Sequence, residues 1–398
     1  MSSSSKMTPL ELRASIGLSG IFGLRMLGMF VILPVFAIYA EQLPGGDNLT
    51  LVGIAIGAYG LTQAVLQIPF GWWSDRYGRK PVVYAGLVIF VIGSFIAALA
   101  PDIHMVILGR VLQGAGAISA AVIAMTADLT REEQRAKAMA MIGSTIGVSF
   151  ALSLVVSPWL NRVIGVPGIF AMTGVLAAAA IVVMWRFIPD APEQAPVRGR
   201  ALKDFWSVLI DPQLARLNWG IFALHAALMA LFIVVPFALR DAGLPLAEHW
   251  KVYLPVMLGS FVLMLPPIMR AGNPAMLRRW FIVSVALLLA AHVALPWLTG
   301  DLWLLSLFLL VFFTPFNVLE AMLPTLTTRL APLQARGTAI GLYSSIQFFG
   351  TFLGAAAGGF LYQHWGATAV IAFNILLLLI WLILAFSMRT TATAQAAL

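Results

Sequence analysis

The chain has 398 residues, of which 61% are hydrophobic and 10% charged, and its mean hydropathy is +0.95. This composition excludes a soluble protein and predicts one that spans a membrane. The formal net charge of +8 would suggest a nucleic-acid partner in a soluble protein, but here it is expected in loops that face anionic lipid. The absence of cysteine excludes disulfides and thiolate chemistry.

Twelve apolar stretches are long enough to cross a bilayer, whose hydrocarbon core needs about 20 residues of helix. The residues before the first stretch lack the apolar core of a cleaved signal, so the first span is expected to be retained. The predicted spans are 14–40, 50–73, 81–100, 103–128, 136–160, 166–188, 213–240, 247–269, 279–298, 302–328, 335–362 and 366–388.

Charge and repeats predict the topology. With both termini in the cytoplasm, 19 of the 24 Lys and Arg residues lie in cytoplasmic segments, which predicts a multi-pass protein of the bacterial inner membrane in that orientation. A polar linker, 191–212, separates a six-helix bundle at 1–190 from another at 213–398, and an offset of 201 residues places Arg135 on Arg336 and Ser144 on Ser345. The sequence therefore predicts an all-α membrane protein of two pseudo-symmetric bundles, with the substrate site between them.

Two motifs make this prediction more specific. The turn Gly71-Trp-Trp-Ser-Asp-Arg-Tyr-Gly-Arg-Lys-Pro81 and the run Arg110-Val-Leu-Gln-Gly-Ala-Gly116 resemble signatures of the major facilitator superfamily, at the positions where that family carries them. Segments 24–30, 59–69 and 248–253 resemble the superfamily's YajR-type branch of drug/proton antiporters. The resemblance implies transport by alternating access.

This sequence departs from that branch in two places. YajR-type proteins carry a small soluble domain after the last helix, whereas this sequence ends at Leu398, shortly after its last predicted span. The antiporter signature of the fifth span survives only as Gly143, Gly147 and Ser157-Pro158. Antiport therefore follows less directly from the resemblance than transport does.

The charged turn predicts a conformational latch formed by Gly71, Asp75, Arg76, Gly78, Arg79 and Asp128. Asp75 ends the second helix where a carboxylate can face the N-terminus of the eleventh, and Arg79 can reach Asp128 at the end of the fourth. Arg76 and Lys80 are also typical of ordinary positive residues on the cytoplasmic side.

Ionisable residues inside the spans are costly and mark functional sites. Glu320, deep in the tenth span, is the first candidate for proton coupling, and Phe312 and Phe316 share its helix face with Asn317 one turn away. A structural partnership for Glu320 is the alternative. His225 and Arg110 are further proton-coupling candidates, although a lone intramembrane His is more often a packing residue, as for His292, and Arg110 can bind carbonyls or Gln113.

Other polar and small residues complete the predicted site. Arg25, Gln63, Gln67 and Tyr343 are candidate cavity residues, as is Tyr59, although each can instead join helices. The small faces Thr145, Ser149, Ser153, Ser157 and Gly350, Gly354, Gly358 are expected to pack at the seam between the bundles. His104, His249 and His364 are expected at outer surfaces.

The sequence favours a secondary transporter that exports hydrophobic or amphipathic small molecules in exchange for protons. The alternatives are a proton symporter or facilitator for a sugar or organic acid, with Arg25 as the anchor, and a transporter-like sensor. The sequence contains no nucleotide-binding P-loop pattern and no cluster of metal-ligand residues, so neither an enzyme, a metal nor a cofactor is expected. One chain holds both halves, so a monomer can function.

Overall fold

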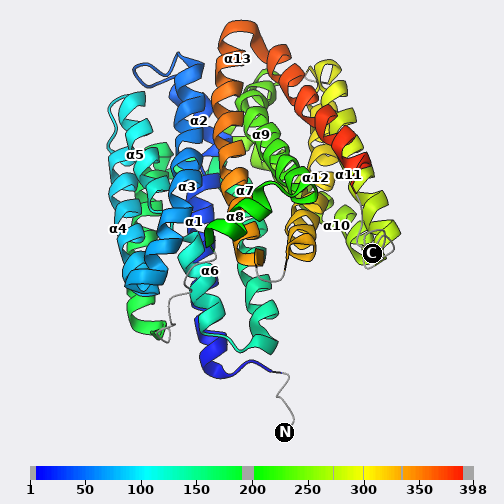
Figure 1. Ribbon diagram of the computed structural model, residues 1–398. Helices are drawn as coiled ribbons and strands as arrows, with labels where there is room; N and C mark the ends of the chain where they lie inside the picture. The colour runs from blue at the N-terminus through cyan, green and yellow to red at the C-terminus, as the bar shows by residue number, and fades with distance from the viewer. Residues whose placement is uncertain (1–5, 191–200, 272, 299, 333–334, 389–398) are drawn as a thin grey trace.

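A computed structural model describes residues 6–190, 201–271, 273–298, 300–332 and 335–388, and the described chain is built from helices without strands. Figure 1 shows long helices running between two ends of the molecule. We call the six spans before residue 191 the N bundle and the six after residue 211 the C bundle. The N bundle contains α1 (Pro9–Phe30), α2 (Leu33–Ala40), α3 (Leu49–Tyr77), α4 (Arg79–Ala98), α5 (Ile103–Ala115), α6 (Ser119–Asp128) and α7 (Glu132–Phe187).

The second half begins with a short helix, α8 (Ala201–Leu209), which lies within the predicted linker, whereas residues 191–200 of that linker lie outside the described part. The C bundle contains α9 (Pro212–Asp241), η1 (Leu246–Glu248), α10 (Trp250–Arg270), α11 (Pro274–Ala294), η2 (Leu295–Trp297), α12 (Leu302–Leu330) and α13 (Arg336–Phe386). Six helices begin at a residue whose side chain accepts a hydrogen bond from a backbone N–H of the first turn, and this cap fixes where the helix starts. The capping residues are Thr8, Asn48, Asp102, Asp211, Asn273 and Asp301.

Ten helical segments of the described chain have the length and apolar composition to cross a membrane. Two of them, α7 and α13, each contain two predicted spans joined at a glycine with positive φ, Gly165 (67°) and Gly366 (75°). These glycines are related by the 201-residue offset, and both turn the chain where an L side chain would be strained. The twelve predicted spans are therefore accounted for.

Two predicted spans differ from the prediction because the helix is interrupted. The span predicted at 14–40 is divided at Val31 and Ile32, ahead of Pro34, which lacks an N–H for the helix ladder. The span predicted at 103–128 is divided at residues 116–118. A Cβ at Gly116 would collide with the carbonyl oxygen of Gly86 on α4, so the interruption lets two backbones approach closely.

The seam between the bundles is closed at one end. Gly53, Gly57 and Gly60 of α3 lie against the backbone of α13 near Ala355, Phe352 and Phe348. Beyond them, the backbone N–H of Leu49 donates to Gln363 Oε1 over 2.7 Å, and Arg240 pairs with Glu41 across the bundles over 2.9 Å. We call the end of the molecule at which α1 begins and α13 finishes the terminal end (Figure 1). The contacts just described lie at the other end, which we call the opposite end.

At the terminal end, α7 and α13 have open space beside them. An added Cβ would meet nothing within 4 Å at Gly143 and Gly147 of α7, or at Gly337 and Gly341 of α13. The bundles are therefore packed together at the opposite end and stand apart toward the terminal end. The space between the bundles is therefore open toward the terminal end and closed at the opposite end.

The small-residue faces lie within the bundles, which corrects the prediction that they form the seam. Ser149 and Ser157 of α7 donate to carbonyl oxygens of α1, those of Gly23 (2.8 Å) and Val31. Gly350, Gly354 and Gly358 of α13 lie against α9 instead. Small residues let each helix approach a neighbour in its own bundle, and the α3 glycines make the seam.

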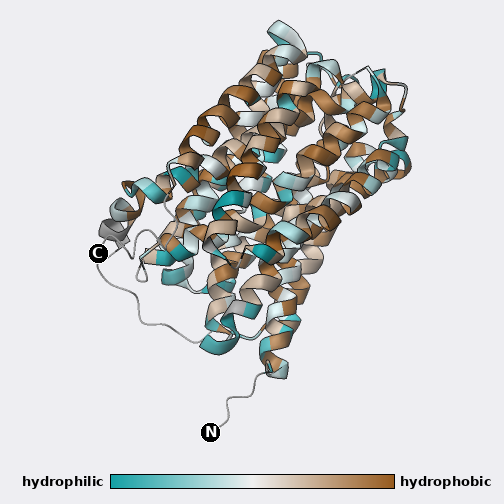
Figure 2. Cartoon of the chain, turned by 90° about the vertical axis from the view of Figure 1, so that its right-hand side faces the viewer, coloured by the Kyte–Doolittle hydropathy of each residue, from teal (hydrophilic) through white to brown (hydrophobic). Residues whose placement is uncertain are grey.

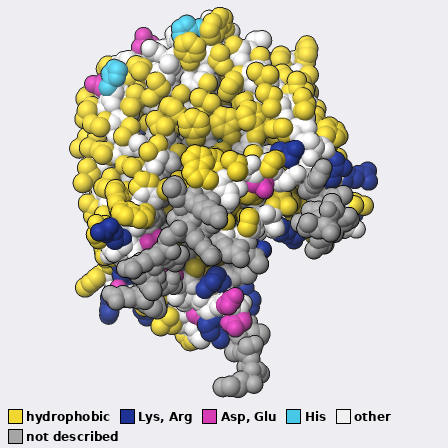
Figure 3. Space-filling view, viewed as in Figure 1, with side chains coloured by type: hydrophobic (Ala, Val, Ile, Leu, Met, Phe, Trp, Pro, Cys, Tyr) yellow, Lys and Arg dark blue, Asp and Glu magenta, His cyan; other side chains and the backbone are white. Residues whose placement is uncertain are grey.

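The surface is divided into an apolar belt and charged ends. Hydrophobic residues dominate the lengths of the helices in Figure 2, and hydrophilic ones gather near the ends. In the face shown in Figure 3, Lys and Arg side chains cluster toward the terminal end, whereas the upper end carries Asp, Glu and His. His249 corrects the expectation of an outer-surface histidine, because its side chain is fully buried and its Nε2 lies 3.1 Å from Leu244 O.

Candidate functional site

The C bundle brings an acid, an amide and an imidazole together. Glu320 on α12 is 23% exposed at its side chain, and its Oε1 accepts from Gln347 Nε2 of α13 over 3.4 Å. The same Gln347 nitrogen lies 2.8 Å from His225 Nε2 of α9. Glu320 Oε2 is buried without a hydrogen-bond partner in the described part of the chain and lies 3.9 Å from His225 Nε2. Two predicted proton-coupling residues therefore meet.

Aromatic rings surround this group and cross the seam. Phe316 on α12 lies 6.0 Å from His225 and 5.9 Å from Phe150 of α7, measured between ring centroids. Phe150, an N-bundle residue, also contacts Phe313 and Phe232 of the C bundle at 5.8 and 6.5 Å. Phe150 follows Gly147 by one helical turn, so the rings lie where the closed part of the seam meets the open part.

The remaining predicted residues of the C bundle take separate positions. Phe312 is buried between Phe316 and His292, with centroids 5.8 and 5.5 Å away. Asn317 Nδ2 donates to Ser260 Oγ of α10 over 3.0 Å, which is a bond between helices. Tyr343 lies one turn before Gln347 on α13, and its buried hydroxyl has no partner among the described residues.

Arg25 lies inside the N bundle, 1% exposed, and is held by neutral acceptors. Its guanidinium donates to Gly116 O, to Tyr59 OH over 2.9 Å and to Gln63 Oε1 over 2.7 Å. Gln63 Nε2 in turn reaches Gln67 Oε1 and Ser119 Oγ, each over 3.2 Å. Three predicted cavity residues, Arg25, Gln63 and Gln67, are therefore fully buried inside one bundle, where Arg25 and Gln63 join helices.

Arg110 belongs to the same buried network. It donates to Gln113 Oε1 over 2.8 Å and to the carbonyl oxygens of Gly28 and Ile56 over 3.2 and 3.4 Å. The centroid of the Tyr59 ring lies 5.0 Å from the Arg110 guanidinium carbon and 5.6 Å from that of Arg25. In the part of the chain that the structure describes, neither arginine pairs with a carboxylate.

Comparison with known proteins gives a family to this arrangement. The profile described as Major Facilitator Superfamily matches residues 18–348. The chain belongs to the Major Facilitator Superfamily. It is 43% identical over 386 residues to the inner membrane transport protein YajR of Escherichia coli K12, an alignment that covers 96% of this chain and 85% of the relative.

Two more distant similarities agree with this assignment. Multidrug resistance protein 1 of Bacillus subtilis is 24% identical over 89% of this chain and 92% of its own. A bacterial homolog of the human lysosomal transporter Spinster, in an inward-facing and occupied conformation, has the same fold at a TM-score of 0.75, with 15% identity over 96% of this chain and 97% of that one. The protein is thus a multi-pass membrane transporter of the major facilitator type, not an enzyme.

The superfamily's charged turn forms the predicted contact between Arg79 and Asp128, whose Nε and Oδ2 atoms are 2.9 Å apart. Arg79 also pairs with Asp75, whose side chain is 61% exposed. Gly78 ends α3 with φ 92°, and Gly71 lies against Ala120 of α6. The guanidinium of Arg76 lies 5.5 Å from the ring centroid of Trp72 on the preceding turn. The pairing of Asp75 with the start of α13 stays a prediction for the state in which the terminal end closes.

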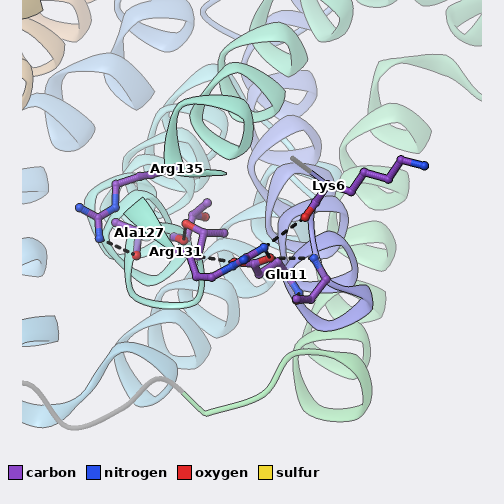
Figure 4. A network of polar contacts seen from close by, with 8 residues as sticks. Lys6, Glu11, Ala127, Arg131 and Arg135 are labelled. Carbon is purple, nitrogen blue, oxygen red and sulfur yellow. Dashed lines mark hydrogen bonds and ion pairs between the residues drawn. The ribbon is translucent and has the colours of Figure 1, made fainter. Parts of the chain in front are cut away.

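A second polar network at the terminal end was not predicted from the sequence. Arg131 donates twice to the buried carboxylate of Glu11, from Nε to Oε1 over 2.9 Å and from Nη2 to Oε2 over 3.0 Å, and its backbone N–H adds a third bond (Figure 4). The same guanidinium donates to Lys6 O. Donation to the Glu11 carboxylate raises the pKa of Arg131 above its ordinary value. This network ties the start of α1 to the turn between α6 and α7.

Two residues of this site, one from each bundle, were missed by sequence reasoning. Gln347 was one of several glutamines in the spans, and only the structure shows that it touches both ionisable groups. Phe150 was one phenylalanine among 25. Helical projections were the available signal: Phe150 follows Gly143 and Gly147 by seven and three residues and shares their face, and Gln347 precedes Gly350 and Gly354 by three and seven residues and shares theirs.

Proposed function

We propose that the protein is a proton-coupled exporter of hydrophobic or amphipathic small molecules, with a preference for cations. Glu320 is the group that binds either the proton or the cargo. The observation that carries this proposal is the position of Glu320 one turn along α12 from Phe316, whose ring stacks on Phe150 of the N bundle, at the border between the packed and open parts of the seam.

The chemistry of the site supports antiport. An ionised Glu320, one helical turn from the stacked rings of Phe316 and Phe150, attracts an amphipathic cation, whose apolar part the rings can cover. A proton on Glu320 removes the charge and with it the attraction. Cargo and proton therefore compete for one group, and the rocking of the bundles carries whichever is bound. Similarity to a multidrug resistance protein is consistent with this cargo class.

This arrangement argues against the alternative in which the substrate is an organic acid. Arg25 is the cation on which it depended, and its guanidinium is enclosed by Gly116, Tyr59 and Gln63 within the N bundle. An anionic cargo would have to displace those acceptors from a side chain that is 1% exposed. We therefore assign Arg25 and Arg110 to the packing of the N bundle.

The setting of the proposed activity follows from the charge distribution. A bacterial inner membrane, with the basic terminal end in the cytoplasm, satisfies the positive-inside rule and agrees with the inner-membrane relative. The open side in this state then faces the cytoplasm, where an exporter collects its cargo. One chain supplies both bundles, so we propose that the monomer is the working unit.

The test is proton release from detergent-solubilised protein when a compound is added, in a screen of cationic, neutral and anionic amphiphiles led by tetraphenylphosphonium. The wild type is expected to release protons on addition of the cation, and Glu320→Gln is expected to abolish the release. Glu248→Gln makes the same chemical change in an exposed pair with Lys251 and is the matched control. Normal release from Glu320→Gln would remove Glu320 from the coupling role, and flux in liposomes without any dependence on a pH gradient would overturn proton coupling.

A further inference from the structure

Four phenylalanine rings form a stacked column that crosses the seam. Three of them are spaced four residues apart on α12. The planes of Phe308 and Phe312 differ by 24° and those of Phe312 and Phe316 by 29°, with centroids 6.2 and 5.8 Å apart. Phe150 of α7 adds the fourth ring, 5.9 Å from Phe316 and again at 29°. Stacked rings at these separations attract one another, so the column ends on a ring that the other bundle supplies.

This last ring differs from the other three. Rings on one helix keep their spacing, whereas the contact between Phe150 and Phe316 joins two bundles that move relative to each other during transport. Along α12, the residue that follows Phe316 at the same spacing is Glu320, about 6 Å further along the helix. The exchangeable place in the column therefore lies within one helical turn of the acid.

Helix α7 offers the Phe150 ring a second place. Side chains on a helix lean toward the turn on their N-terminal side, which for Phe150 contains Gly147. A Cβ added at Gly147 would meet nothing within 4 Å, so the space beside this turn is open. Phe150 itself is only 4% exposed. A change of its rotamer can therefore carry the ring from Phe316 into the open space beside Gly147.

The move has a cost that only a suitable ligand can offset. Besides the stack on Phe316, Phe150 gives up its contacts with Phe313 and Phe232, at 5.8 and 6.5 Å between centroids. A flat ring that takes the vacated place restores these contacts, because it meets the same three C-bundle rings. An aliphatic group of similar volume restores the burial but not the stacking. The exchange therefore favours a ligand with a planar aromatic ring.

We propose that Phe150 occupies the binding place of an aromatic ring of the cargo, and that a planar aromatic cation binds by displacing it. This inference rests on the proposed role of Glu320 in binding a cationic cargo. The ring of the cargo stacks on Phe316, its charge lies within reach of Glu320, and the Phe150 ring turns over Gly147. In the empty transporter Phe150 covers Phe316 and competes with the cargo. Phe150 is thus a specificity determinant that selects flat aromatic cations over aliphatic ones of equal charge.

The test compares two monovalent cations by calorimetric titration of the detergent-solubilised full chain: ethidium, which has a planar ring system, and tetrabutylammonium, which has no ring. In Phe150→Ala the place on Phe316 is vacant, so ethidium is expected to bind about 2- to 10-fold more tightly than to the wild type. Gly147→Leu fills the space into which the ring turns, and ethidium is expected to bind weaker by a similar factor. Tetrabutylammonium should bind both variants as it binds the wild type.

Matched controls remove or add the same groups elsewhere. Phe349→Ala takes a ring from another stacked pair, 6.1 Å from Phe222 at 27°, and Gly143→Leu adds a side chain one turn further along the open part of α7. Neither should change the ratio of the two affinities.

The displacement requires opposite shifts in ethidium affinity from Phe150→Ala and Gly147→Leu. An unchanged affinity in either variant, a shift of both in one direction, or the absence of ethidium binding to every variant would overturn it. If Phe150→Ala does not fold, Phe150→Leu removes the ring with a smaller loss of volume. Failure of the proposed antiport is distinguishable, since it appears as normal proton release from Glu320→Gln whatever the ratio of the two affinities.

Discussion

The two bundles can be compared position by position with the 201-residue offset. The offset pairs Leu24, next to Arg25 in the N bundle, with His225 of the C bundle. It pairs Ser119 with Glu320. Both bundles thus place polar groups at related depths. In the N bundle the charged groups are arginines, which keep their charge at any working pH. In the C bundle they are an acid and an imidazole, which can exchange protons with water.

The partners of these groups differ in the same way. Arg25 and Arg110 bind carbonyl oxygens, amide oxygens and a phenol, which remain acceptors whatever the proton concentration. Glu320 and His225 share one partner, Gln347, and Glu320 keeps one oxygen without a partner in the described chain. The comparison teaches that buried charge by itself does not mark a coupling site. A coupling site also needs groups that can gain or lose a proton, as Glu320 and His225 can.

The largest effect expected from this comparison is the loss of stability in Arg110→Met. Methionine fills the space but donates nothing, so Gly28 O, Ile56 O and Gln113 Oε1 lose their donor. We expect a loss on the order of 3 kcal/mol in the free energy of unfolding, seen as a lower melting temperature by tryptophan fluorescence. A variant that melts like the wild type but releases no protons with tetraphenylphosphonium would place Arg110 in the coupling machinery and break the comparison.

Glu320→Gln should change the free energy of unfolding less than Arg110→Met does, and should raise it rather than lower it. The substitution replaces a partly enclosed carboxyl group that has an unpartnered oxygen by a neutral amide of the same shape. In the melting assay used for Arg110→Met we expect an unchanged or higher melting temperature, with a gain of at most about 1 kcal/mol. A loss as large as that of Arg110→Met would instead assign Glu320 to the structural partnership that the sequence left open.

Much of the fold could be predicted from the sequence, because the bilayer dictates span length and charge asymmetry and the repeat can be seen along the chain. The interruption in the fourth span could not. It depends on a contact between backbones, Gly116 against Gly86, that no single helix reveals. The interruption in the first span lies ahead of Pro34, which is visible in the sequence but was not used. The small faces of the fifth and eleventh spans were recognised as packing surfaces, but their neighbours depend on the rotation of each helix about its own axis.

The candidate site was predicted in part for the same reason. Glu320, His225 and Phe316 stood out because ionisable groups and a ring one turn away are readable along one helix. The contact of Glu320 with His225 through Gln347 joins three helices, and the burial of Arg25 depends on α3 and α5. The candidate residues could be identified because charged residues are rare inside the spans. Only the three-dimensional structure shows that Arg25 lies inside one bundle and that Glu320 lies near the seam.

The smallest effect expected is that of removing one hydroxyl from the N bundle. Tyr59→Phe loses the hydrogen bond with Arg25, 2.9 Å long, but keeps the ring beside both arginines. We expect a loss of about 1 kcal/mol in the melting assay and normal proton release. Tyr253→Phe is the matched control, because Tyr253 is equally buried and its hydroxyl has no partner among the described residues, so its removal should cost nothing. Equal losses in the two variants would mean that the hydroxyl of Tyr59 contributes no more than an unpaired one, and that the N-bundle arginines are held by carbonyl oxygens and glutamines alone.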